Sequence, residues 1–154
     1  MSRLTVRCIR AAMLALAAGI LLGVAFALDR SLGARLRPLH AELNLWGWST
    51  LLIYGVGYHM LPRFCGRPLA RPRLAEAQGW LAIGGVAAAS LGWLLSLAEP
   101  LTQSRPQAGR MAQLVSGAPA ALLAAGGLAQ LAAALIFVSL AAALLRPGAA
   151  GPSC

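Results

Sequence analysis

Four long apolar stretches divide this 154-residue sequence and constrain its fold more than any other feature. They run over about residues 11–28, 39–61, 80–98 and 114–145, near or above the roughly 20 apolar residues that a bilayer-spanning helix needs. The Gly, Pro and Arg clusters between them are typical of helix ends and loops. The pattern predicts an all-α protein, an integral membrane four-helix bundle in which residues 1–154 form a single transmembrane domain.

Charged side chains are scarce. They make up 11% of the chain, against about 25% in a typical soluble domain. Only four acids and two histidines are present, and the three cysteines lack a metal-binding spacing such as Cys-x-x-Cys. The sequence also has no nucleotide-binding loop, nucleophile–base pair or paired carboxylates. This inventory excludes a soluble globular enzyme, a disordered tail and a disulfide scaffold.

All 13 basic residues are arginines, and the formal net charge is +9. The arginines flank the apolar stretches instead of forming one patch, so membrane topology explains them better than nucleic-acid binding does. A cytoplasmic N-terminus places eight arginines inside and five outside, which predicts that both termini are cytoplasmic. The Arg-, Ala- and Gly-rich composition indicates a bacterial source, and we therefore expect a multi-pass protein of the bacterial cytoplasmic (inner) membrane.

The first apolar stretch has an alternative interpretation as a cleaved secretion signal. Three arginines precede it, residues 11–24 resemble a signal core, and Ala25-Phe26-Ala27 fits a small-x-small cleavage site. Cleavage there leaves three spans and an outside N-terminus. The sequence leaves both interpretations open.

Small residues recur every four positions in three of the stretches, a spacing that lets helix backbones approach closely in lipid. These series are Ala11, Ala15, Gly19, Gly23 and Ala27; Gly84, Ala88 and Gly92; and Gly117, Ala121, Ala125, Ala129 and Ala133.

The second stretch carries most of the polar side chains that mark a functional site inside a membrane. At about 100° per residue, one helical stripe holds His40, Asn44, Gly47, Leu51 and Tyr58. Gly47 is expected to leave room beside this stripe for something flat and bulky. Glu42 points about 200° away from the stripe and is expected to face lipid or to pair with Arg35 or Arg37.

The two histidines cannot share one metal ion in a straight helix. His40 and His59 are 19 residues apart, which corresponds to about 28 Å of helical rise. Each would need ligands from another helix or another subunit. The alternatives without a metal are an interfacial contact for His40 and a helix-end contact for His59, where a cation complements exposed carbonyl groups.

Residues 35–66 resemble the second transmembrane helix of heme–copper oxidase catalytic subunits (subunit I), especially the C-type oxidases and nitric oxide reductases. The similar residues are Arg35-Leu36-Arg37-Pro38-Leu39-His40, the Asn44 and Trp46 region, the ending Gly55, Tyr58, His59 and Pro62, and Gly66. The likeness is greater to short subunit I-like membrane proteins than to the full subunit of about twelve helices.

This resemblance implies that His40 is an axial ligand to the iron of heme b, with Asn44 and Gly47 beside the cofactor. His59 is the second metal-ligand candidate. Methionine is a further axial ligand type for heme, with Met13, Met60 and Met111 as candidates. Short relatives often have a His-x-His-x-Asn pattern, and Glu42 occupies its second histidine position here. We therefore expect no metal ligand at Glu42.

The resemblance also limits the chemistry. A complete oxidase of the family uses six histidines for its two hemes and its copper, and this chain has two. A complete oxidase and a copper site are therefore not expected. We expect heme b binding through His40 for electron transfer or diatomic gas handling, in a homodimer or larger respiratory or denitrification complex within the lipid bilayer, without nucleic acid. The alternative is a non-catalytic membrane partner or assembly factor of such a complex.

Overall fold

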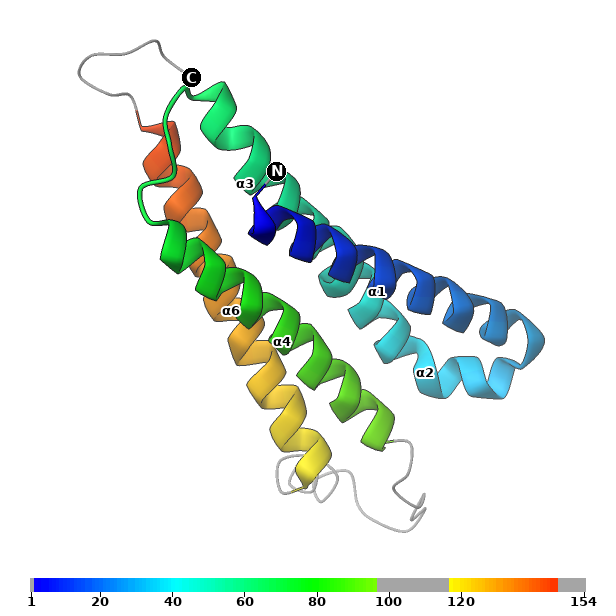
Figure 1. The fold of residues 1–154 in the computed structure, drawn as a ribbon. Helices are drawn as coiled ribbons and strands as arrows, with labels where there is room; N and C mark the ends of the chain where they lie inside the picture. The colour runs from blue at the N-terminus through cyan, green and yellow to red at the C-terminus, as the bar shows by residue number, and fades with distance from the viewer. Residues whose placement is uncertain (1, 97–116, 147–154) are drawn as a thin grey trace.

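The structure, a computed structural model, describes residues 2–96 and 117–146, apart from the side chain at position 32 (Figure 1). The described residues are mostly helical and contain no strand, as predicted. The helices are α1 (Arg3–Leu28), α2 (Arg30–Glu42), the π-helix η1 (Leu43–Thr50), α3 (Leu51–Phe64), α4 (Pro72–Ser96) and α6 (Ala118–Leu145).

The second predicted helix is longer than its apolar stretch. The elements α2, η1 and α3 follow one another without a break, so residues 30–64 form one continuous rod that contains the predicted span 39–61. Three other helices, α1, α4 and α6, are long and apolar enough to cross a membrane. The prediction of a membrane protein built from four helical rods agrees with this architecture.

The helices also extend into the arginine-rich segments beside the apolar stretches. The α1 helix starts at Arg3 because Ser2 caps it, with the Ser2 hydroxyl accepting a hydrogen bond from the Thr5 amide at 3.2 Å. The α4 helix begins with Pro72, a residue suited to a first helical position because it lacks an amide hydrogen. Capping and proline, rather than hydrophobicity, set these two starts.

The rods form two antiparallel hairpins. In the first hairpin, α1 packs along α2, η1 and α3, and the chain reverses at Asp29, whose side chain accepts hydrogen bonds from the Ser31 amide and hydroxyl (Figure 1). In the second hairpin, α4 and α6 lie side by side (Figure 1). The starts of α1 and α4 and the ends of α3 and α6 lie toward the same end of the molecule (Figure 1). We call it the arginine-rich end, because these helix ends carry Arg3, Arg7, Arg63 and Arg73.

Aromatic rings join the two hairpins near the arginine-rich end. The rings of Tyr54 and Tyr58 on α3 lie 4.6 and 5.3 Å, centre to centre, from the ring of Phe137 on α6. On the other face of α3, Gly55 lies against Cys8 of α1, where an added Cβ would come within 3.1 Å of the Cys8 Cβ. The α3 helix is therefore packed between α1 of its own hairpin and α6 of the second.

Candidate functional site

His40 lies against α1 within the first hairpin. Its Nδ1 atom is 2.9 Å from the carbonyl oxygen of Gly19. Because a carbonyl oxygen only accepts hydrogen bonds, Nδ1 carries the proton and donates it to Gly19. In the neutral imidazole with this tautomer, the second ring nitrogen, Nε2, has a lone pair to offer a metal.

The ring of His40 is fixed by apolar neighbours on α1. The Phe26 ring lies 5.3 Å away, centre to centre, at a tilt of 58°. Gly23 lies beside the edge of the ring, where an added Cβ would be 3.4 Å from the His40 Cε1 atom. A single orientation of the imidazole results from these contacts together with the hydrogen bond to Gly19.

Asn44 supports the same arrangement one turn later. Its amide nitrogen donates to the main-chain carbonyl of His40 at 2.8 Å. The Asn44 side chain also fills the space above Gly19, where an added Cβ would meet Nδ2 at 2.6 Å. Asn44 thus packs across to α1 while its hydrogen bond stays within its own helix.

The π-helix η1 begins at Leu43, within this turn, and includes Asn44. Its wide turns are stabilised by two hydroxyls, since Ser49 donates to the carbonyl of Asn44 at 3.0 Å and Thr50 donates to the carbonyl of Leu45 at 2.8 Å. Such π-helical segments are rare and frequently lie at functional sites. Here the segment directly follows α2, which carries His40, and it contains Asn44 and Gly47.

Gly47 is buried where η1 touches α1. An added Cβ would come within 2.6 Å of the Ala15 Cβ and 3.5 Å of a Val86 methyl group. The space that we expected beside Gly47 is therefore occupied by side chains of the same chain. Gly47 does face α1, together with His40 and Asn44, as the predicted stripe requires.

Glu42 faces the second hairpin instead of α1. It accepts a hydrogen bond from the side-chain amide of Gln130 on α6, which is 5% exposed. The expected neighbour of Glu42 was lipid or an arginine, and the structure places Gln130 there instead. A single amide in an otherwise apolar helix was the available signal, and Gln78 on α4, which is fully buried and donates to the Ala133 carbonyl, is a second example.

The second metal-ligand candidate, His59, is partly exposed near the end of α3, far along the same rod from His40. Among the described residues, no group of three or more His, Cys, Asp or Glu side chains could hold a metal ion. Met13 is exposed on α1, Met60 follows His59, and Met111 lies outside the described residues. Of the predicted site residues, the structure thus brings together His40, Asn44 and Gly47, and not His59.

The chain matches the family model of cytochrome c and quinol oxidase polypeptide I over residues 3–151. Neither the curated proteins nor the solved structures give a match. The family match extends the resemblance seen at residues 35–66 to almost the whole sequence and includes all four rods. This chain therefore belongs to the cytochrome c and quinol oxidase polypeptide I family, as a short relative of the heme–copper oxidase catalytic subunit.

Proposed function

We propose that this protein is a small subunit I-like membrane protein that binds heme b through His40 and serves electron transfer or diatomic gas handling. One observation carries the proposal. The Nδ1–H group of His40 donates to the Gly19 carbonyl, which leaves Nε2 available to the iron. Metal-binding histidines in proteins almost always donate their other N–H group to a carbonyl, a carboxylate or water.

The neighbours of His40 have defined roles in this proposal. Gly19 accepts its proton, and Phe26 and Gly23 fix the ring plane. Asn44 and Gly47 act through packing, because they set how closely the rod approaches α1. A bound heme would supply one-electron chemistry or, without a second axial protein ligand, a site for a diatomic ligand.

A second axial ligand has to come from outside this four-helix unit if it is a histidine. The only other histidine of the chain, His59, lies about 28 Å away along the rod. His40 of a second, parallel subunit or a ligand from a larger respiratory or denitrification complex would complete the coordination. Two histidines are too few for the two hemes and the copper of a complete oxidase, so we propose neither copper binding nor complete oxidase activity.

We further propose that the protein resides in the bacterial inner membrane with both termini in the cytoplasm. The arginine distribution of eight against five supports this orientation. The fold supports a retained α1, since Ala15 and Gly19 of this helix fit against Gly47 and Asn44. A cleaved α1 would remove the acceptor of the His40 hydrogen bond.

The absorption spectrum of the full chain, purified from heme-replete cells, tests the assignment. We expect a Soret band that is lost in His40→Ala, because no other side chain of the cluster can ligate iron. The matched control is His59→Ala, which removes the other histidine and should keep the band. A colourless wild-type protein, or an unchanged band in His40→Ala, would contradict the proposal.

A non-catalytic role as a membrane partner or assembly factor is the second candidate. It is favoured by the packing of His40, whose ring and Nδ1–H are both engaged with α1. The same contacts would then serve only to hold the first hairpin together. A colourless protein that co-purifies with a large respiratory or denitrification complex would favour this function over heme binding.

A further inference from the structure

A pocket of about 300 Å³ lies at the arginine-rich end, between the starts of α1 and α4. It is far along the rod from His40 and does not depend on the proposed heme. Its walls are mainly apolar, and its polar groups come from the first residues of α1, from α3 and from α4. The lining residues are Ser2, Arg3, Leu4, Tyr58, Leu69, Pro72 and Glu76.

Tyr58 brings an unsatisfied hydroxyl group to this pocket. The residue is only 9% exposed, and its Oη atom has no hydrogen-bond partner among the residues that the structure describes. The ring is held edge-on against Phe137, so the hydroxyl cannot simply turn toward water. Buried polar groups normally have partners, and this hydroxyl belongs to a residue that lines the pocket and has none among the described residues.

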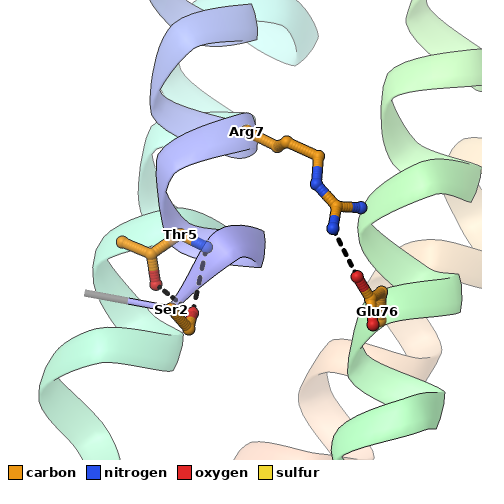
Figure 2. A network of polar contacts seen from close by, with 4 residues as sticks. All are labelled: Ser2, Thr5, Arg7 and Glu76. Carbon is orange, nitrogen blue, oxygen red and sulfur yellow. Dashed lines mark hydrogen bonds and ion pairs between the residues drawn. The ribbon is translucent and has the colours of Figure 1, made fainter.

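The pocket also has a positive electrostatic character. Two helices, α1 and α4, begin at its rim, and helix starts favour anions through their free amide groups and dipoles. Arg3 adds a full positive charge. The one acid of the lining, Glu76, is engaged by Arg7, whose guanidinium lies 2.5 Å from the carboxylate (Figure 2). Figure 2 shows this ion pair joining α1 to α4, so it leaves Arg3 without a neutralising partner in the lining.

From these groups we infer that the pocket binds the headgroup of an anionic phospholipid. The phosphate lies at Arg3 and Ser2, where the first turn of α1 begins. The Tyr58 hydroxyl donates to an oxygen of the phosphate or of the adjoining glycerol ester. Leu4, Leu69 and Pro72 contact the start of the acyl chains.

Free phosphate shares the same anionic chemistry, but the apolar walls favour a lipid. Leu4, Leu69 and Pro72 offer nothing to a hydrated ion and suit hydrocarbon. The position at the starts of two apolar helices also corresponds to the headgroup level of a bilayer. Anionic lipids bind in this way to basic pockets between transmembrane helices on the cytoplasmic side.

Lipid binding to the full chain, delipidated in detergent, tests this assignment. Phosphatidylglycerol and phosphatidylcholine with identical acyl chains are titrated separately, and bound lipid is counted by native mass spectrometry. We expect phosphatidylglycerol to bind at least about fivefold more tightly, and Arg3→Gln to remove most of that preference. The control for charge is Arg63→Gln, which removes an exposed arginine that does not line the pocket.

The hydroxyl is tested by Tyr58→Phe, which keeps the ring against Phe137. Loss of one hydrogen bond should weaken phosphatidylglycerol binding about 2- to 12-fold. The matched control is Tyr54→Phe, because Tyr54 also packs on Phe137 and is outside this pocket. If Tyr58→Phe does not fold, the exposed position of Arg3 makes Arg3→Gln decisive by itself.

Three outcomes would overturn the inference. The first is equal affinity for the two lipids. The second is an equal loss of binding in Tyr58→Phe and Tyr54→Phe. The third is inorganic phosphate that binds at millimolar concentration, displaces the lipid and depends on Arg3, which would assign the pocket to a free anion.

Discussion

The two hairpins are both held by small residues, but the atoms that meet are different. In the second hairpin, glycines bring backbone against backbone, and an added Cβ at Gly126 would lie 2.7 Å from the Ala89 amide nitrogen and 2.8 Å from the Gly85 carbonyl oxygen. In the first hairpin, the glycines receive side chains. Gly19 accommodates Asn44, and Gly23 accommodates the ring of His40.

This difference separates a scaffold from a site. Direct backbone contact maximises van der Waals packing in lipid but leaves no room for a functional side chain. Glycines that face polar side chains instead hold those side chains in one position. The first hairpin therefore fixes the orientation of His40, and the second supplies a rigid support against which Glu42 and Tyr58 pack.

The largest effect is expected where two backbones meet. Gly126→Ala places a methyl group against main-chain atoms of α4 that cannot move aside, and we expect the free energy of unfolding to fall by about 3 kcal/mol. The adjacent Gly127→Ala is the control, since an added Cβ there meets nothing within 4 Å. Both variants can be compared by unfolding in increasing mole fractions of SDS, and equal stabilities would break the proposed contrast.

The fold was largely predictable from hydrophobicity, because four apolar stretches of membrane-spanning length leave few alternatives to a helical bundle. The faces of the helices were less predictable. The spacing of four in the third stretch favoured Gly84, Ala88 and Gly92. Gly92 does pack against α6, but Gly84 has nothing within 4 Å, and Gly85 and Ala89 pack against α6 instead. In a helix rich in Gly and Ala, neighbouring faces have almost the same hydrophobicity, so the partner helix decides which one is buried.

The candidate site was predictable along one helix but not across helices. Helical periodicity predicts the stripe of His40, Asn44, Gly47, Leu51 and Tyr58. The structure places the first three against α1, whereas the Tyr58 ring contacts Phe137 on α6. Periodicity carries no information about the partner, so neither the Gly19 acceptor of His40 nor the Gln130 donor to Glu42 could be predicted. Helical periodicity also presupposes α-helical turns, whereas Leu43–Thr50 form a π-helix.

A second test concerns the buried link between the hairpins. Gln130→Leu keeps a similar volume but removes the amide that donates to Glu42, and we expect a loss of about 2 kcal/mol because a half-buried carboxylate loses its donor. The double variant Glu42→Leu/Gln130→Leu should recover much of the stability, since both polar groups are then gone. If the loss of stability in the double variant equals the sum of the losses in Glu42→Leu and Gln130→Leu, measured by SDS titration, this hydrogen bond does not couple the hairpins.

A third test addresses the support of His40. Gly19→Ala pushes its methyl group into the Asn44 side chain, which can move, so the expected loss of stability is smaller, about 1 kcal/mol for one hydrogen bond. The control is Gly23→Ala, where the nearest atom lies at an ordinary contact distance of 3.4 Å. If the proposed heme is bound, its retention should fall more in Gly19→Ala than in Gly23→Ala. The reverse order would contradict the positioning role of Asn44.

The smallest effect is expected at the exposed link between the hairpins. The side chains of Arg7 and Glu76 are 31% and 49% exposed, and an ion pair of this kind contributes at most about 1 kcal/mol. Arg7 also lies over the ring of Trp80, 5.0 Å from its centre, a contact that Glu76→Gln leaves intact. Glu76→Gln should therefore lower the stability less than Arg7→Gln, and a double-mutant cycle in low and high salt isolates the ion pair.

The salt dependence distinguishes the two links between the hairpins. Water and salt screen the pair of Arg7 and Glu76 and not the contact between Glu42 and Gln130, so only the coupling energy of the ion pair should fall as salt is added. The ranking of the two links would be reversed if the coupling energy between Arg7 and Glu76 did not depend on salt and exceeded that between Glu42 and Gln130. The main connection between the hairpins would then lie at the arginine-rich end.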